Sequence, residues 1–151
     1  MWRVGRSAAL VALLAALFVA YPVTQARGSA TFEMIGKIND LRRSHGLRTL
    51  RMSSSLTHSA EAYADTMMDR QYFGHANRIQ ASARYRRLGE ILEIHRGSQP
   101  GTGTAYRDWL HSPEHLGIIL DPSFTYVGGG YTAGRFQGRS DTIWVMHFGR
   151  L

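Results

Sequence analysis

Residues 124–149, FTYVGGGYTAGRFQGRSDTIWVMHFG, differ in character from everything before them in the chain. The runs 124–134 and 141–149 are rich in aromatic and β-branched residues, which favour strands. Gly134 to Ser140 separates the two runs. Two such runs joined by a short glycine-containing segment predict an antiparallel hairpin. The C-terminal third therefore supplies the sheet of the domain.

Upstream of this hairpin the apolar residues recur at helical spacing. In residues 31–44 the apolar positions fall three apart and predict one face of an amphipathic helix that ends at His45-Gly46. Ser53–Ser55 offer N-caps for a second helix, which we expect to end near Tyr72-Phe73-Gly74. The predicted buried faces consist of Phe32, Ile35, Ile38 and Leu41 in the first helix, and of Leu56, Ala60, Tyr63, Ala64, Met67 and Met68 in the second.

The middle of the chain mixes both kinds of pattern. We predict a short third helix over residues 78–87, an extended segment over 89–97 and a further helix over 105–110. Another helix should run from Pro113 to about Leu120. Four or five helices and a small antiparallel sheet together predict an α+β domain with helices packed on the sheet.

Residues 1–26 resemble a secretory signal peptide. Two arginines precede about 14 apolar or small residues (7–20), and small residues suit cleavage within 24–26 or 28–30. The apolar run is shorter than the roughly 20 residues that span a bilayer. We therefore expect cleavage and no stable membrane span afterwards, with an uncleaved N-terminal anchor as the alternative. The chain has no cysteine, so the mature domain, residues 27–151, contains no disulfide and no reactive thiol.

The charge pattern argues against a nucleic-acid-binding protein. The net charge is +7, and removal of Arg3 and Arg6 leaves 7 − 2 = +5. The basic residues are scattered, which is typical of solvated helix surfaces rather than of a nucleic-acid-binding patch. A modest positive charge suits an envelope that contains anionic polymers and lipids. The sequence also contains no phosphate-binding glycine motif and no G-x-S-x-G nucleophile elbow.

The segment His111-Ser112-Pro113-Glu114-His115 matches H-x-x-E-H, a zinc-peptidase pattern. Such a site needs both histidines on one face of an uninterrupted helix. Proline inside that helix would cost about 3 kcal/mol. The easier interpretation makes Ser112 the N-cap, Pro113 the first helical residue and His115 the third, so that His111 lies outside the helix.

Three residues are candidates for a functional site. His115 lies in the first turn of a helix, where a neutral imidazole is favoured and could bind metal or accept a proton. His75 follows the long second helix, where a cationic cap is the structural alternative. Glu90 has apolar neighbours, and strand alternation groups it with Leu92 and Ile94 on one face, opposite Glu93. A buried carboxylate of this kind requires a partner.

These residues belong to an ordered set of short motifs. The set resembles bacterial members of the CAP superfamily, named for cysteine-rich secretory proteins, antigen 5 and pathogenesis-related proteins and also called SCP domains. The resemblance covers about residues 31–151. The residues of this motif set are Asn39, Leu50, Leu56, Ala60, Met67, Tyr72-Phe73-Gly74-His75, Gly89-Glu90, Trp109, Ser112-Pro113-Glu114-His115 and His147-Phe148-Gly149.

The resemblance implies an α-β-α sandwich with a central cavity that holds two histidines and two glutamates. His75, Glu90 and His115 match three of these positions, in motifs written F-x-H, G-E-N and S-P-G-H-R in the family. The fourth position is open. Glu114 is the nearest carboxylate, although it replaces a glycine and helix geometry turns it about 100° away from His115.

This chain departs from the family pattern beside the site. Ile91 replaces the asparagine of G-E-N, Leu116 replaces the arginine of S-P-G-H-R, and Glu93 stands where small residues are usual. The first two changes remove polar groups that would orient metal ligands.

The resemblance implies a secreted, monomeric binding domain for a lipid, a cell-wall component or a divalent metal. Two imidazoles and a carboxylate, from His75, Glu90 and His115, suit Zn²⁺ with an open fourth position. A zinc-dependent hydrolase that uses the same three residues is therefore the alternative. A structural or interaction module without a ligand is the third hypothesis.

Overall fold

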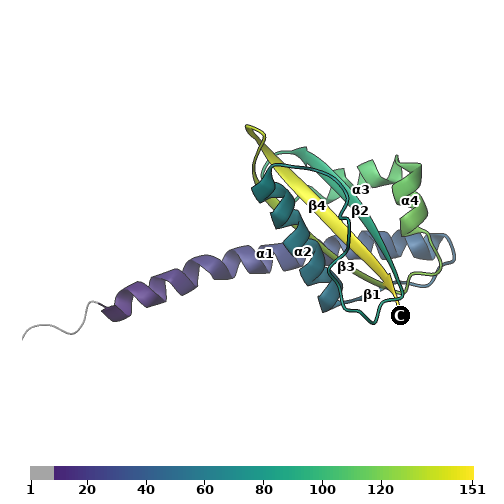
Figure 1. Ribbon diagram of the computed structural model, residues 1–151, viewed down its shortest axis with the longest axis horizontal. Helices are drawn as coiled ribbons and strands as arrows, with labels where there is room; N and C mark the ends of the chain where they lie inside the picture. Colours follow the sequence, from purple (N-terminus) through teal and green to yellow (C-terminus); the bar gives the residue numbers. More distant parts are fainter. Residues whose placement is uncertain (1–8) are drawn as a thin grey trace, which may run out of the picture.

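The computed structural model describes the backbone of residues 9–151 and the side chains from residue 25 onward. A four-stranded sheet with the order β1-β3-β4-β2 lies at the centre (Figure 1). The elements in chain order are α1 (Ala9–Ser44), β1 (Arg51–Met52), α2 (Ser54–Arg70), β2 (Arg87–Arg96), α3 (Thr102–Leu110), α4 (Pro113–Ile119), β3 (Tyr126–Phe136) and β4 (Arg139–Arg150).

Two hydrophobic clusters, one on each face of the sheet, hold the helices in place. Buried residues of α1, α3 and α4 pack on one face, where Ile91 and Trp144 point. Buried residues of α2 pack on the other face, against Leu92 and Val145. The domain is therefore an α-β-α sandwich, as the resemblance implied.

The predicted hairpin is confirmed. Strands β3 and β4 pair antiparallel from Tyr126↔Gly149 to Phe136↔Arg139. The turn is tighter than predicted, because only Gln137 and Gly138 connect the strands, both with positive φ. Such a two-residue turn matches the right-handed twist of paired strands. The prediction of a small antiparallel sheet is wrong in one respect, since β1 pairs parallel with β3.

Two glycines of β3 let α2 approach the sheet closely. Gly128 and Gly130 face α2. A Cβ added at Gly128 would lie 2.2 Å from the backbone nitrogen of Thr57, and one at Gly130 would lie 2.7 Å from the Cα of Glu61. Only glycine leaves room for helix backbone at this distance. The glycine run thus sets the distance between α2 and the sheet.

The first helix departs partly from its prediction. Ile35 and Ile38 are buried as expected, but Phe32 is 71% exposed. The buried face runs instead through Thr31 and Met34, which lie on the same side of the helix as Ile35 and Ile38. Further along, the buried Arg42 donates hydrogen bonds to backbone carbonyls, including that of Ile119 at 2.7 Å. This contact ties the end of α1 to α4.

The second helix begins as predicted, with the Ser53 hydroxyl accepting from the backbone nitrogen of Leu56. The predicted helix over 78–87 is wrong, because residues 71–86 form a loop that leads into β2. Tertiary hydrogen bonds hold this loop in place. The backbone nitrogen of Ser82 donates to the Ser55 hydroxyl, and the Tyr85 hydroxyl pairs with that of Ser53. These contacts to the start of α2 outweigh the local helical preference.

Of the two short helices, α4 follows its capping signal and α3 does not. Helix α3 begins at Thr102, before the predicted residue 105, after Gly101 in a left-handed conformation. Helix α4 begins as predicted, with Pro113 in its first turn and the Ser112 hydroxyl accepting from the backbone nitrogen of His115. His111 lies outside α4, and its imidazole bonds to the carbonyl of Arg107 instead. The H-x-x-E-H segment is therefore a helix start and not a two-histidine face.

The close approach at Gly128 generates a prediction about stability. In Gly128→Ala the new methyl group meets the backbone of α2, which cannot move independently of the sheet. We expect the free energy of unfolding to fall by about 3 kcal/mol or more, measured by urea denaturation. Gly36→Ala is the matched control, because its Cβ would meet nothing within 4 Å. Equal stability of the two variants would contradict the packing account.

Candidate functional site

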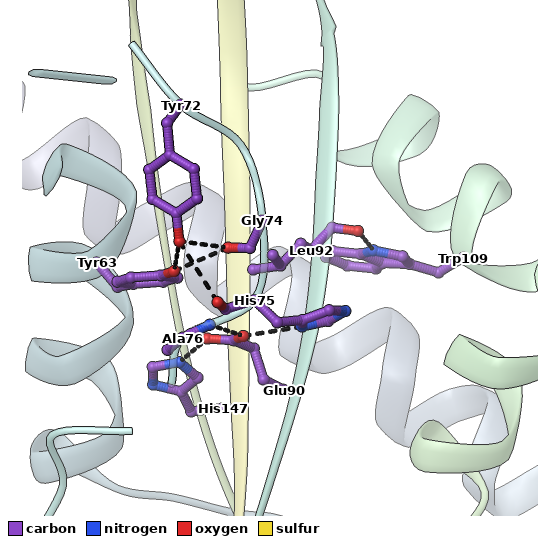
Figure 2. A network of polar contacts seen from close by, with 9 residues as sticks. All are labelled: Tyr63, Tyr72, Gly74, His75, Ala76, Glu90, Leu92, Trp109 and His147. Carbon is purple, nitrogen blue, oxygen red and sulfur yellow. Dashed lines mark hydrogen bonds and ion pairs between the residues drawn. The ribbon is translucent and has the colours of Figure 1, made fainter. Parts of the chain in front are cut away.

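The site is built around the carboxylate of Glu90, which is only 8% exposed. One oxygen, Oε1, accepts from His75 Nδ1 and from the backbone nitrogen of Ala76, both at 2.9 Å. The other oxygen, Oε2, accepts from His147 Nε2 at 2.8 Å (Figure 2). Burial alone would raise the pKa of Glu90, but the hydrogen bonds from His147, Ala76 and His75 outweigh it. The pKa therefore lies below its ordinary value.

Strand register brings Glu90 and His147 together. Glu90 on β2 lies directly opposite His147 on β4. Directly opposed residues share one face of a sheet, and here that face packs against α2. Leu92 and Ile94 contribute to the hydrophobic cluster on this α2 face. Strand alternation correctly predicted that Glu90 shares one face with these two residues.

His147 completes the network. It belongs to one of the motifs that resemble the CAP family, but it was not predicted as a site residue. Its side chain is 1% exposed, and its second ring nitrogen, Nδ1, has no hydrogen-bond partner. In the sequence it stands inside an apolar strand, where a histidine gives no local signal. Only the pairing register of β2 with β4 could have identified it. The ring lies on the α2 side of Glu90 (Figure 2).

His75 lies at the surface end of the same network. Its side chain is 63% exposed, although Nδ1 is held by Glu90. The loop that carries it is fixed by Tyr63, whose hydroxyl donates to the carbonyl of Gly74 at 2.8 Å and pairs with the Tyr72 hydroxyl. Burial, with help from the Tyr72 hydrogen bond, raises the pKa of Tyr63. The phenol stays protonated and keeps the loop against α2 (Figure 2).

His115 lies within electrostatic reach of His75. Burial lowers the pKa of His115, positive charge on His75 lowers it further, and Glu114 partly opposes both. No hydrogen bond joins the His115 ring to Glu90 or His75. Glu114 itself is exposed in the first turn of α4. Within the described part of the chain, no three His, Asp or Glu side chains form a group that could hold a metal ion. The set His75, Glu90 and His115 remains a prediction as a metal site.

A second buried carboxylate lies on the opposite face of the sheet. Glu93 Oε2 bonds to His95 Nδ1 at 2.9 Å, and Glu93 is 6% exposed. Burial raises the pKa of Glu93 to about 7, the pair with His95 opposes this rise, and nearby Asp108 adds to it. The sequence correctly placed Glu93 opposite Glu90, so the two carboxylates belong to separate environments.

A profile of the cysteine-rich secretory protein family, CAP, matches residues 35–148. The chain belongs to the CAP family. It contains none of the cysteines in the family's name.

A curated relative of this CAP domain comes from Bacillus subtilis. The uncharacterized protein YkwD of Bacillus subtilis is 30% identical over 119 residues, which are 73% of this chain and 43% of that protein. The chain therefore spans less than half the length of this curated relative.

Several solved structures share the fold of the CAP domain. An extracellular SCP-domain protein of Bacillus anthracis matches with a TM-score of 0.67 and 19% identity, covering 83% of this chain and 41% of that one. An outer surface protein of Borrelia burgdorferi matches with a TM-score of 0.64 and 20% identity, covering 77% and 88%. Venom allergen-like protein 4 of Schistosoma mansoni matches with a TM-score of 0.60 and 11% identity, covering 83% and 88%.

The buried Glu93 generates a prediction about pH. Because its pKa rises from 4.5 unfolded to about 7 folded, the folded state holds the proton more tightly. This contribution to stability is complete below pH 4.5 and is lost as the pH rises to about 7. The loss is on the order of 3 kcal/mol.

In Glu93→Gln we expect this decline to disappear, as measured by urea denaturation at several pH values between 4 and 8. Glu114→Gln is the control, because that carboxylate is exposed. If the free energy of unfolding of Glu93→Gln still declines with pH as it does in the wild type, another group causes the decline.

Proposed function

We propose that the chain is an exported CAP-domain binding protein whose recognition site is the Glu90 network, and that it is not a hydrolase. The observation that supports this proposal is the hydrogen bonding of both carboxylate oxygens of Glu90. A general base needs a free oxygen within reach of the proton it removes, and a pKa near the working pH. Glu90 has three donors and a lowered pKa, which suits an orienting group.

The orientation of His75 supports a role in binding. Because Nδ1 donates to Glu90, the neutral ring keeps its lone pair on Nε2. A histidine that donates its other nitrogen to a carboxylate is the usual arrangement behind a metal ligand. The exposed position of His75 leaves Nε2 accessible from solvent.

His115 provides the second imidazole. Its lowered pKa keeps the ring neutral, and therefore able to bind, at a more acidic pH than an ordinary histidine. A divalent cation would be held by His75 and His115, with Glu90 orienting His75. A catalytic zinc site has three protein ligands, and the donor set here does not supply a third. Oxygen atoms of a bound ligand would complete the coordination of the cation.

The proposed location is the cell envelope or the extracellular space, where lipids and wall polymers are available. The Bacillus anthracis neighbour is described as extracellular and that of Borrelia burgdorferi as an outer surface protein. Among residues with described side chains, no helix is long and apolar enough to cross a membrane.

Arg27 pairs with Asp65 at 3.3 Å, so cleavage of the predicted signal after Ala26 would preserve this contact. The intact mass of the exported protein identifies its first residue. A first residue other than Arg27 would contradict this cleavage site.

The metal-binding part of the proposal is tested by titrating the purified chain with Zn²⁺ in a calorimeter at pH 7.5. We expect saturable binding that weakens at least tenfold in His75→Ala and in His115→Ala, because each variant removes one of two ligands. Glu90→Gln should weaken binding less, since it changes only the orientation of His75.

His111→Ala is the matched control, because His111 lies four residues from His115 and is exposed. Equal Zn²⁺ affinity of the wild type and the His75→Ala/His115→Ala double variant would refute the metal site. Metal-dependent cleavage of a peptide library would refute the preference for binding over hydrolysis.

A further inference from the structure

The fold gathers, at one end of the sheet, arginines that are scattered along the chain. Strands β1, β2 and β3 begin at this end, β4 finishes there, and Figure 1 shows the C-terminus beside them. The segments that meet there are 45–57, 79–89, 121–127 and 148–151, and they contain one acidic residue, Asp121. Their six exposed arginines, here named the arginine end, are Arg48, Arg51, Arg84, Arg86, Arg87 and Arg150.

Backbone pairing holds these segments together. The backbone nitrogen of Arg51 donates to the carbonyl of Thr125, and that of Arg86 donates to the carbonyl of Arg150, each at 2.9 Å. In the sheet, Arg87 lies directly opposite Arg150. Like charges in opposed positions destabilise a sheet, so this arrangement has a cost that packing alone does not explain.

The single acidic residue neutralises only one of the arginines. Asp121 Oδ2 pairs with Arg87 Nη2 at 2.7 Å. The buried Arg42 donates to the carbonyls of Arg48 and Asp121, both at 3.0 Å, so Arg48 lies close to this pair. Among the residues with described side chains, no ion pair involves the other five members of the arginine end.

The arginine end carries the whole net charge of the mature domain. The rest of residues 27–151 contains ten basic and ten acidic residues, which balance. The six arginines and Asp121 therefore account for the net charge of +5. Charge concentrated at one end of a molecule attracts and orients an oppositely charged surface.

Aromatic rings hold two of these positive charges in place. The Arg51 guanidinium lies 5.5 Å from the centre of the Tyr126 ring, and that of Arg84 lies 5.6 Å from the centre of the Tyr85 ring. The two rings contact each other edge to face, with their centres 5.9 Å apart. Cation–π contacts favour these positions without neutralising the charge, so both guanidinium groups stay available to an anion.

Exposed apolar side chains at the same end indicate the kind of anionic partner. Met52 is 50% exposed and follows Arg51, and Leu151 is 44% exposed and follows Arg150. At a bilayer surface, arginines reach the lipid phosphates while neighbouring apolar side chains enter the layer below them. A dissolved polyanion offers no apolar phase to Met52 and Leu151, so the combination favours a membrane.

We propose that the arginine end docks on the surface of a bilayer that contains anionic phospholipids, with Met52 and Leu151 inserted between the headgroups. This surface is distinct from the proposed metal site, because it contains neither a residue of the Glu90 network nor His115. It adds a means of holding the domain at the envelope.

Vesicle flotation of the exported protein tests the proposal. We expect binding to vesicles of equal parts phosphatidylcholine and phosphatidylglycerol, and no binding to phosphatidylcholine alone. Binding should be lost in 1 M salt, where the screening length is about 3 Å. All variants share one N-terminus, so the apolar segment 7–20, if retained, adds equally to binding of both kinds of vesicle.

The double variant Arg86→Ala/Arg150→Ala should bind the anionic vesicles about 25-fold more weakly, since each arginine near an anionic surface contributes about fivefold. The matched control is Arg96→Ala/Arg135→Ala, which removes the same charge from exposed positions at the opposite end of the sheet. The control should change the affinity less than twofold. Thermal melts show whether each variant is folded.

Met52→Ser separates a bilayer from a dissolved polyanion. It should weaken binding to the anionic vesicles several-fold and leave binding of soluble polyphosphate unchanged. The proposal is overturned by equal binding to both kinds of vesicle, by equal loss in the two arginine double variants, or by unchanged vesicle binding in Met52→Ser. Tighter binding of polyphosphate than of the vesicles at equal phosphate concentration would assign the arginine end to a dissolved polyanion and would also overturn it.

Discussion

The arrangement of the site depends on the need to satisfy one buried carboxylate. Glu90 lies among apolar residues, where an unpaired charge would be far too costly to keep. Its three hydrogen-bond donors come from β4 and from the loop that follows α2. The same bonds that stabilise the carboxylate therefore fix that loop and the central strand relative to β2. A change at Glu90 would affect the position of His75 and the burial of His147 together.

Helix packing creates the environment in which these bonds are strong. Gly128 lies opposite His147 in the β3–β4 register, and its missing side chain lets the backbone of α2 reach the sheet. The helix consequently covers His147 and excludes water from its bond to Glu90. A hydrogen bond to a charged group is stronger in such a low-dielectric setting than in water. The glycine run and the carboxylate network are thus two parts of one arrangement.

Local signals in the sequence predicted much of the fold. The hairpin follows from strand propensity, and the start of α4 follows from Ser112 and Pro113. The burial of Glu90 follows from alternation along β2. These features depend on interactions between residues that are close in the chain, so they can be predicted from the sequence. The ordered motifs added the sandwich architecture, which no local pattern could supply.

Features that depend on distant contacts could not be predicted in this way. Residues 71–86 form a loop because Ser53 and Ser55, about 30 residues away, bond to it. The parallel pairing of β1 and the role of His147 likewise arise from strand register. His115 was predicted as a ligand, but its relation to His75 depends on how α4 packs, which no spacing rule gives. The fourth site position was sought at Glu114, which is exposed, whereas the side chain that completes the Glu90 network is His147.

The central claim is that Glu90 is an ionised, fully hydrogen-bonded carboxylate that orients imidazoles and does not act as a base. The most direct test is an NMR pH titration of the Glu90 side-chain carboxyl carbon, together with the ring nitrogens of His147. The account predicts that Glu90 titrates below its ordinary pKa of 4.5 and that the proton of the neutral His147 ring is on Nε2. A pKa of Glu90 above 4.5, or a neutral His147 protonated on Nδ1, would contradict it.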